Sequence, residues 1–190
     1  MKAGATLTTD RLVLRHWRPE ADGEVFHRLN SDERVMHFFP FRRDRAESDA
    51  MMTRIGEMIA RDGYGWCAFT LRGDGTVIGF GGLARVHDLP CAPATEIGWR
   101  LLPEHWRKGY ASEAGAALLA YAFSELGLEE VVSFAVQNNH ASTGVMRRIG
   151  MVAEPDRDFD HPRVPDTRPE LKRHAFYRIT RAQWGSRQPG

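Results

Sequence analysis

Cysteine is scarce in this sequence: Cys67 and Cys91 are the only two among 190 residues. Two thiols cannot build a disulfide framework or a cysteine-based metal site, and we expect both to be reduced. The sequence also lacks any run of the roughly 18 apolar residues that a membrane-spanning helix needs. Residues 1–15 contain no continuous apolar segment typical of a secretory signal. We therefore expect a cytoplasmic protein with no membrane partner.

An excess of charge of either sign is also missing. The 26 Lys and Arg residues nearly balance 25 Asp and Glu residues, and the formal net charge is +1. Proteins that hold nucleic acid through many phosphates usually carry a basic excess, so no nucleic acid partner is expected. The eight histidines show no metal-ligand spacing, which predicts no metal site, and His161 and His174 are expected at the surface.

The hydrophobic content, 42%, is sufficient for one core of ordinary size. We predict a single domain over residues 1–190, with a core from about 10 to 180. Hydrophobic periodicity indicates a mixed α/β order, in which an antiparallel meander meets a strand–helix–strand unit. The Asp44 and Glu47 pair resembles a capping box, and Gly73-Asp-Gly75 is typical of a hairpin turn. Strands are expected at residues 11–16, 66–71, 77–86, 95–102, 131–136 and 173–180, and helices are expected to begin at or near Pro19, Asp44, Gly109 and Asn139.

The most informative segment, Trp106-Arg-Lys-Gly-Tyr-Ala-Ser112, joins a predicted strand to a predicted helix. The first N–H groups of a helix lack partners within it, and the helix dipole makes that end positive. Gly109 lets a ligand approach the main chain, so the segment suits an anionic phosphate group. The alternative is an ordinary helix start with a solvated Arg-Lys pair. A P-loop spacing is absent, and Gly79-Phe-Gly-Gly82 lies within a strand, as in a bulged strand near a ligand.

Three segments in this order resemble the GNAT superfamily of N-acetyltransferases. Trp106-Arg-Lys-Gly-Tyr-Ala111 is similar to the family's pyrophosphate loop. Glu96-Ile-Gly-Trp-Arg-Leu101 before it, and the stretch from Asn139 to Met151 after it, resemble the RimJ/RimL-type branch, named for ribosomal-protein N-terminal acetylation. In element order the resemblance runs from Leu12 to about Tyr177. It implies the GNAT fold: a central, mostly antiparallel sheet that splays apart at the cofactor site and is flanked by helices.

The resemblance also implies acetyl-CoA as co-substrate, bound where two central strands splay. Backbone groups of Trp99 and Leu101 would pair with the pantetheine arm, Asn139 would fix it from the other side, and Ser142 would point at the thioester sulfur. Simple helix capping is the alternative for Asn139 and Ser142. The pyrophosphate would be held by Trp106, Arg107, Lys108, Gly109, Tyr110, Ala111 and Ser112.

The sequence departs from the family pattern at three positions. Trp106 occupies the usual Gln or Arg position, and Arg107 stands where a glycine is frequent. The tyrosine that many members use as general acid would fall at Met146, which cannot donate a proton. The leading interpretation is an amine acetyltransferase. The competing one is a CoA-binding regulatory or interaction module that has lost catalysis.

Direct transfer needs a neutral amine and a proton for the departing thiolate. Glu96, on an otherwise apolar strand, is the candidate base, and Ser142 is the candidate proton donor. The alternative for Glu96 is a structural carboxylate paired with Arg85 or Arg100. An α-amine with a pKa near ~8 is far easier to deprotonate than a lysine with a pKa near ~10.4, which favours an N-terminal or small-molecule α-amine.

The acceptor side is expected at the aromatic run that follows the first helix. Phe38, Phe39 and Phe41 fall where the family's substrate-side loop lies, beside Arg42 and Arg43. Ordinary core or dimer packing is the alternative for these aromatics. The sequence leaves open whether the protein is a monomer or a homodimer.

Overall fold

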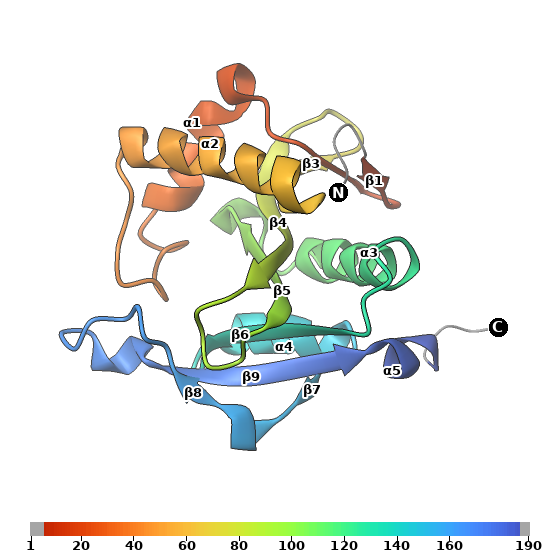
Figure 1. Cartoon of the computed structure of the whole chain (residues 1–190). Helices are drawn as coiled ribbons and strands as arrows, with labels where there is room; N and C mark the ends of the chain where they lie inside the picture. Colours follow the sequence, from red (N-terminus) through yellow and green to blue (C-terminus); the bar gives the residue numbers. More distant parts are fainter. Residues whose placement is uncertain (1–5, 187–190) are drawn as a thin grey trace.

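The computed structural model describes residues 6–186. Within this range the strands form one nine-stranded sheet in the order β1-β2-β3-β4-β5-β6-β9-β7, with β8 paired to β9 (Figure 1). The strands are β1 (Leu7–Thr8), β2 (Leu12–Arg15), β3 (Trp66–Leu71), β4 (Val77–Val86), β5 (Ala94–Leu101), β6 (Glu130–Val136), β7 (Val152–Ala153), β8 (Phe159–Asp160) and β9 (Arg173–Thr180). The helices are α1 (Pro19–Ser31), α2 (Arg45–Asp62), α3 (Tyr110–Ser124), α4 (His140–Arg148) and α5 (Arg181–Gly185).

The sheet divides between β5 and β6. These strands are parallel and their ladder holds a single residue pair, Glu96 with Val132. The other neighbouring strands pair antiparallel, for example β4 with β5 and β6 with β9. Figure 1 shows the result: β4 and β5 run steeply through the molecule, whereas β6 and β9 cross its lower part. The predicted mixed α/β fold with a splayed, mostly antiparallel sheet is confirmed.

Helices cover both faces of the sheet, as the alternation of side chains along β5 requires. Ile97 and Leu101 face a core built with α3 and α4, in which Leu118 and Met146 are also buried. On the other face, Phe80 packs in a second core with α1 and α2. Glu96, Gly98 and Arg100 alternate with the first set and therefore lie on the α1–α2 face.

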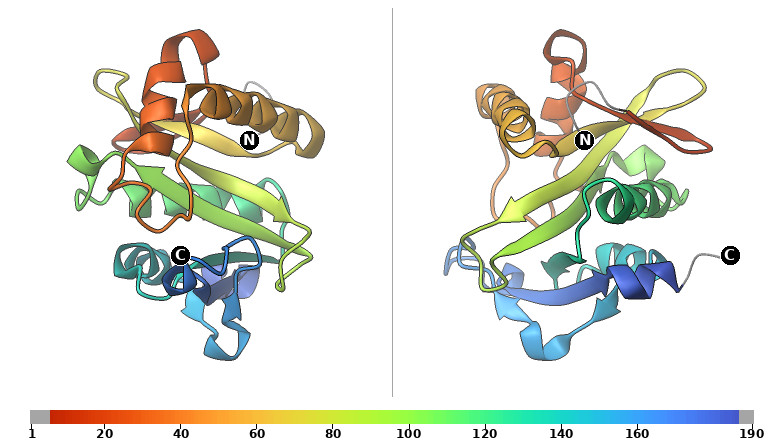
Figure 2. Two further views of the ribbon diagram at one scale, coloured as in Figure 1. Left: turned by 90° about the vertical axis from the view of Figure 1, so that its left-hand side faces the viewer. Right: turned by 45° about the vertical axis from the view of Figure 1, so that its right-hand side comes forward.

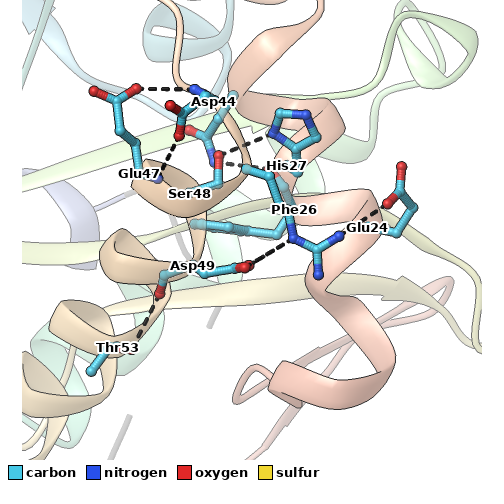
Figure 3. A network of polar contacts seen from close by, with 10 residues as sticks. Glu24, Phe26, His27, Asp44, Glu47, Ser48, Asp49 and Thr53 are labelled. Carbon is cyan, nitrogen blue, oxygen red and sulfur yellow. Dashed lines mark hydrogen bonds and ion pairs between the residues drawn. The ribbon is translucent and has the colours of Figure 1, made fainter.

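Short local motifs define both ends of α2. The Asp44 side chain accepts from the Glu47 N–H at 2.8 Å, and the Glu47 carboxylate accepts from the Asp44 N–H at 3.0 Å, a complete capping box (Figure 3). Gly63 ends α2 with a left-handed φ of 77°. A contact of 3.3 Å between His27 Nδ1 and Ser48 Oγ then joins α1 to α2 (Figure 3).

The glycines of β4 let the neighbouring strands approach closely. The ladder between β3 and β4 shifts register between Phe69 and Thr70, which confirms the expected bulge. A Cβ at Gly79 would lie 2.3 Å from the Arg100 carbonyl oxygen, and one at Gly82 would lie 2.1 Å from that of Gly65. Close backbone approach on both sides therefore excludes side chains here.

The structure corrects the expected surface position of His174, whereas His161 is half-buried. His174 is only 9% exposed, and its ring centroid lies 4.9 Å from that of His161. Burial, reinforced by the charges of His174 and Arg163, lowers the pKa of His161 to about 4. The late loop folds back on β9 and brings the two rings together, which their spacing in the sequence does not reveal.

Candidate active site

Two helix N-termini converge where the sheet divides. The parallel strands β5 and β6 each continue into a helix, β5 into α3 and β6 into α4. The carboxyl ends of parallel strands meet at one edge, and ligands of open α/β sheets bind in the crevice outside those ends. Each helix directs unpaired N–H groups and a positive dipole toward that edge. The arrangement suits a ligand that carries negative charge and lies between the two strands.

The predicted phosphate loop supplies a row of free donors. None of the backbone N–H groups from Arg107 to Ser112 donates a hydrogen bond to another residue between 6 and 186. Gly109 is the N-cap of α3 at φ 83°, and Arg107 also adopts a left-handed φ of 59°. This conformation favours glycine, because a non-glycine residue there costs about 1–2 kcal/mol. The free donors and the exposed Arg107 and Lys108 side chains fit a pyrophosphate.

Arg11 is a neighbour of this loop that the sequence did not indicate. Its guanidinium donates to the Lys108 carbonyl at 2.9 Å, forms an ion pair with Glu113 at 2.6 Å, and lies 4.7 Å over the ring of Tyr110. Arg11 thus ties the residue before β2 to the first turn of α3. Since 97 residues separate Arg11 from Lys108, no local pattern could have linked them.

The free edge of β5 faces the gap. The Leu102 N–H donates to the Ile78 carbonyl of β4 at 2.9 Å, so the backbone groups of Trp99 and Leu101, on the opposite edge, point toward β6. The Ser133 hydroxyl reaches the Ile97 carbonyl at 2.8 Å, and beyond this point the strands part. The indole Nε1 of Trp106 donates to the Leu101 carbonyl at 2.7 Å, so this side chain closes the turn after β5.

Asn139 caps α4 through its side-chain oxygen, and its side-chain NH₂ group is left for other hydrogen bonds. Its Oδ1 accepts from the Ser142 N–H at 3.1 Å, which confirms the capping interpretation. Its amide NH₂ and the Ser142 hydroxyl donate to no other residue in the described part of the chain. Both side chains are partly exposed and follow the carboxyl end of β6. They are available to a ligand in the gap.

Met146 occupies the expected tyrosine position and is part of the core. It is 1% exposed, packed with residues of α3 and β5. Tyr177 is 5% exposed, and its hydroxyl accepts from Arg147 at 2.9 Å. The chain therefore carries no proton donor at position 146 itself.

Glu96 belongs to the single residue pair that joins β5 to β6. No ion pair or hydrogen bond joins its carboxylate to another residue in the range 6–186. The pairing with Arg85 or Arg100 held open above does not occur: Arg85 lies over the ring of Tyr64, and Arg100 donates to Asn30. Burial raises the pKa of Glu96 to about 7, against a smaller opposing effect of the Arg163 charge. A carboxylate with that pKa is a suitable base near neutral pH.

The raised pKa predicts a stability effect that can be measured without any substrate. The pKa of Glu96 is about 7 in the folded chain, against an ordinary 4.5, so folding is penalised as pH rises through this window. Glu96→Gln removes the ionisable group. We expect equal stabilities below about pH 4.5, and a variant about 1–3 kcal/mol more stable above pH 7, the lower end reflecting partial solvent access.

Urea unfolding of both proteins between pH 4 and 8 measures this difference. Glu113→Gln is the matched control, because the Glu113 carboxylate accepts from Thr9 and Arg11. Burial would raise the pKa of Glu113, but these hydrogen bonds outweigh it and lower the pKa. This control should be less stable than the wild type, by a difference that develops below about pH 4.5 and stays constant from there to pH 8. A Glu96→Gln advantage that does not change with pH would contradict the assignment of a buried ionising carboxylate.

The aromatic segment between α1 and α2 lies across the Glu96 face, where it passes in front of β4 and β5 (Figure 2, left). Phe39 covers the Arg100 guanidinium at 4.2 Å, whereas Phe41 is 44% exposed beneath Arg43 at 4.4 Å. Phe38 packs in a small core cluster with Val136, so packing accounts for this residue. A cavity of about 340 Å³ is lined by Glu33, Met36, His37, Phe39, Pro40, Phe41, Arg42 and Arg168.

Two features are absent from the described residues, a metal-ligand cluster and a membrane-spanning helix. From residue 6 to 186, no three His, Cys, Asp or Glu side chains are grouped so as to hold a metal ion. No helix in that range has both the length and the apolar character required to cross a bilayer.

Comparison with known proteins agrees with this geometry. The family model described as "Acetyltransferase (GNAT) domain" matches residues 11–152. The chain is 32% identical to the FsC-acetyl coenzyme A-N(2)-transacetylase of Aspergillus fumigatus, over 97% of this chain and 80% of that protein. It is 30% identical to the uncharacterized N-acetyltransferase YoaA of Bacillus subtilis, over 78% and 83%.

Solved structures show the same fold. An acetyltransferase of the GNAT family from Bacillus anthracis superimposes with a TM-score of 0.77 at 25% sequence identity, covering 94% of this chain and 99% of that one. The chain belongs to the GNAT acetyltransferase family, and it is an acetyltransferase.

Proposed function

We propose that this enzyme transfers the acetyl group of acetyl-CoA to a primary amine, an N-terminal or small-molecule α-amine, in a ternary complex. The observation that carries the proposal is the row of unpaired N–H groups from Arg107 to Ser112 beside the free edge of β5. Acetyl-CoA is the co-substrate typical of the family, and the Aspergillus relative is named for it. The match of the segments around Glu96 and Asn139 supports a RimJ/RimL-type branch.

In the proposed complex, the chain binds acetyl-CoA mainly through its backbone. Residues 106–112 receive the pyrophosphate, and the backbone of Trp99 and the N–H of Leu101 pair with the amide groups of the pantetheine arm. The free amide NH₂ of Asn139 binds the arm from the α4 side. The acceptor amine then approaches from the α1–α2 face, where Glu96 lies.

The chemical step divides between Glu96 and Ser142. The amine nitrogen forms a bond to the acetyl carbon while the bond from that carbon to sulfur breaks. Glu96 takes the proton that the nitrogen loses and passes it to solvent. The Ser142 hydroxyl donates a proton to the thiolate and recovers one from solvent. A thiol with a pKa near ~8.5 is a good leaving group, so Ser142 needs to contribute only modestly.

Ser142→Ala tests the second role. We expect kcat to fall about three- to tenfold, because protonation of the thiolate then depends on solvent, while the affinity for acetyl-CoA stays within about twofold. Steady-state kinetics with acetyl-CoA titrations give both values. Loss of affinity at unchanged kcat would assign Ser142 to binding instead.

Release of free CoA thiol tests the function as a whole. The protein is mixed with acetyl-CoA and, in turn, peptides with varied N-termini, free amino acids, polyamines and aminoglycosides. Thiol release that depends on an amine supports the transferase. Binding of acetyl-CoA without release from any acceptor would favour the competing interpretation, a CoA-binding module without catalysis.

A further inference from the structure

Arg100 is an enclosed cation without a counter-ion. Its Nη1 donates to Asn30 Oδ1 at 2.7 Å and to the Leu29 carbonyl at 3.4 Å, and its guanidinium lies over the rings of Phe39 and Phe80 at 4.2 and 5.1 Å. In the described range no carboxylate forms an ion pair with it. Charged groups removed from water are normally paired with an opposite charge. The positive charge of Arg100 has no such partner among residues 6–186.

The contrast with Arg15 shows what is missing. Arg15 is also largely buried, but both of its terminal nitrogens donate to the Asp22 carboxylate, at 2.7 and 2.9 Å. Around Arg100 the nearby charge has the same sign: burial, reinforced by Arg43, lowers the pKa of Arg100 to about 9. Arg100 therefore stays protonated at pH 7 beside a second cation, a setting that favours an anion.

The free edge of the guanidinium indicates which anion fits. Nη1 is occupied by Asn30 and Leu29, whereas the buried Nε has no acceptor. Nε and Nη2 present two parallel N–H groups along one edge, the geometry that a carboxylate accepts with both oxygens. A carboxylate on this edge would satisfy the orphaned Nε and neutralise the charge.

The position of Arg100 relates this anion site to the proposed base. Glu96, Gly98 and Arg100 alternate along one face of β5, and at about 3.3 Å per residue the outer two α-carbons are about 13 Å apart. Glu96 leans into this interval, since its Oε1 lies 3.5 Å from where a Cβ of Gly98 would be. The Trp66 indole lies over Gly98, with ring carbons 3.1 and 3.2 Å from where a Cβ of this residue would be, so this ring would flank a molecule placed in the interval. The two ends of a short molecule can therefore engage an acid and a cation on the same strand.

We propose that the acceptor is an amine that carries a carboxylate at the other end of a short chain, with the carboxylate bound by Arg100 and the amine directed at Glu96. This inference rests on the proposed amine transfer. Phe39 lines the 340 Å³ cavity and also covers Arg100, so the acceptor displaces this ring on entry. The nearby Arg43 adds a second positive charge to the carboxylate end.

Matched acceptors that differ only in the carboxylate test the inference. These are glycylglycine, glycyl-β-alanine and triglycine, whose α-amines lie at the other end of a short chain from the carboxylate, each against its own amide and assayed by release of CoA thiol. We expect the wild-type enzyme to favour at least one acid over its amide by about 10- to 100-fold in kcat/KM, the range for loss of a charge-assisted pair of hydrogen bonds. Equal rates for acid and amide throughout would overturn the inference while leaving amine transfer intact.

Variants of Arg100 assign the preference to this residue. Arg100→Met should abolish the acid preference and leave the amide rates within about threefold, whereas Arg100→Lys should keep part of it. Arg61→Met is the control, because Arg61 is exposed and pairs only with Asp62. If Arg100→Met lowered acid and amide rates equally at an unchanged melting temperature, Arg100 would be structural and the inference wrong.

A measurement on the wild-type enzyme covers the case in which Arg100→Met does not fold. Butyrate should compete with an amide acceptor at a concentration at least tenfold lower than butyramide. Equal inhibition by the two would refute the carboxylate site. Thiol release from no acid and no amide would refute the proposed transfer to short amines, and this inference with it.

Discussion

Glu96→Gln should reduce acetyl transfer at pH 7 by about 10²- to 10⁴-fold, the usual range for a positioned general base. The substitution keeps the shape of the side chain and removes its ability to accept a proton. An α-amine with a pKa near ~8 is about one-tenth neutral at pH 7, so most acceptors arrive protonated. Raising the pH should recover part of the activity, because solvent then deprotonates the amine.

The pH profile of the wild-type enzyme carries a second expectation. Glu96 must be ionised to act as a base, and burial raises its pKa to about 7. The kcat/KM for the acceptor should therefore rise through pH 7 in the wild type. Glu96→Gln should lack the part of this rise that comes from ionisation of Glu96. Profiles between pH 6 and 10 measure both effects, with Glu57→Gln, an exposed carboxylate on α2, as the control. Parallel profiles of similar height would show that Glu96 is structural.

The elements that sequence reasoning predicted well are those specified by near neighbours in the chain. The bounds of β3, β4 and β9 match the predicted strands residue for residue. Alternation, turn glycines and the Asp44–Glu47 box act within a few residues, so the sequence states them directly. The free N–H donors of the phosphate loop were predicted in the same way, from the start of a single helix, α3.

The residues that sequence reasoning missed are brought to the site by long-range contacts. Arg11 reaches the phosphate loop from the other end of the chain, and Arg100 meets Asn30 from 70 residues away. The pKa of Glu96 depends on burial by several elements, which no local pattern encodes. Even Arg107 was understood only as a substitution for glycine, because its left-handed φ of 59° is a property of the folded loop.

The phosphate loop predicts the effect of removing a single backbone donor. Ala111 is the second residue of α3, and its N–H has no partner in the described chain. Proline is tolerated in the first turn of a helix, since no helical hydrogen bond is lost there. Ala111→Pro should therefore fold but lack one N–H of the proposed pyrophosphate cradle. Losing a hydrogen bond to a charged group costs about 1.5–3 kcal/mol, so we expect the Kd for acetyl-CoA to rise about 10- to 100-fold.

The chain offers a closely matched control for this experiment. Ala46 is the second residue of α2, and its N–H is likewise unpaired among the described residues, so Ala46→Pro imposes the same first-turn change at a helix start away from β5 and β6. Calorimetric titration of both variants with acetyl-CoA should give a wild-type Kd for Ala46→Pro alone. At saturating acetyl-CoA the kcat of Ala111→Pro should stay within a few-fold, because Glu96 lies on β5 and is untouched. If both variants bound acetyl-CoA as tightly as the wild type, the start of α3 would be an ordinary helix end and the cofactor would lie elsewhere.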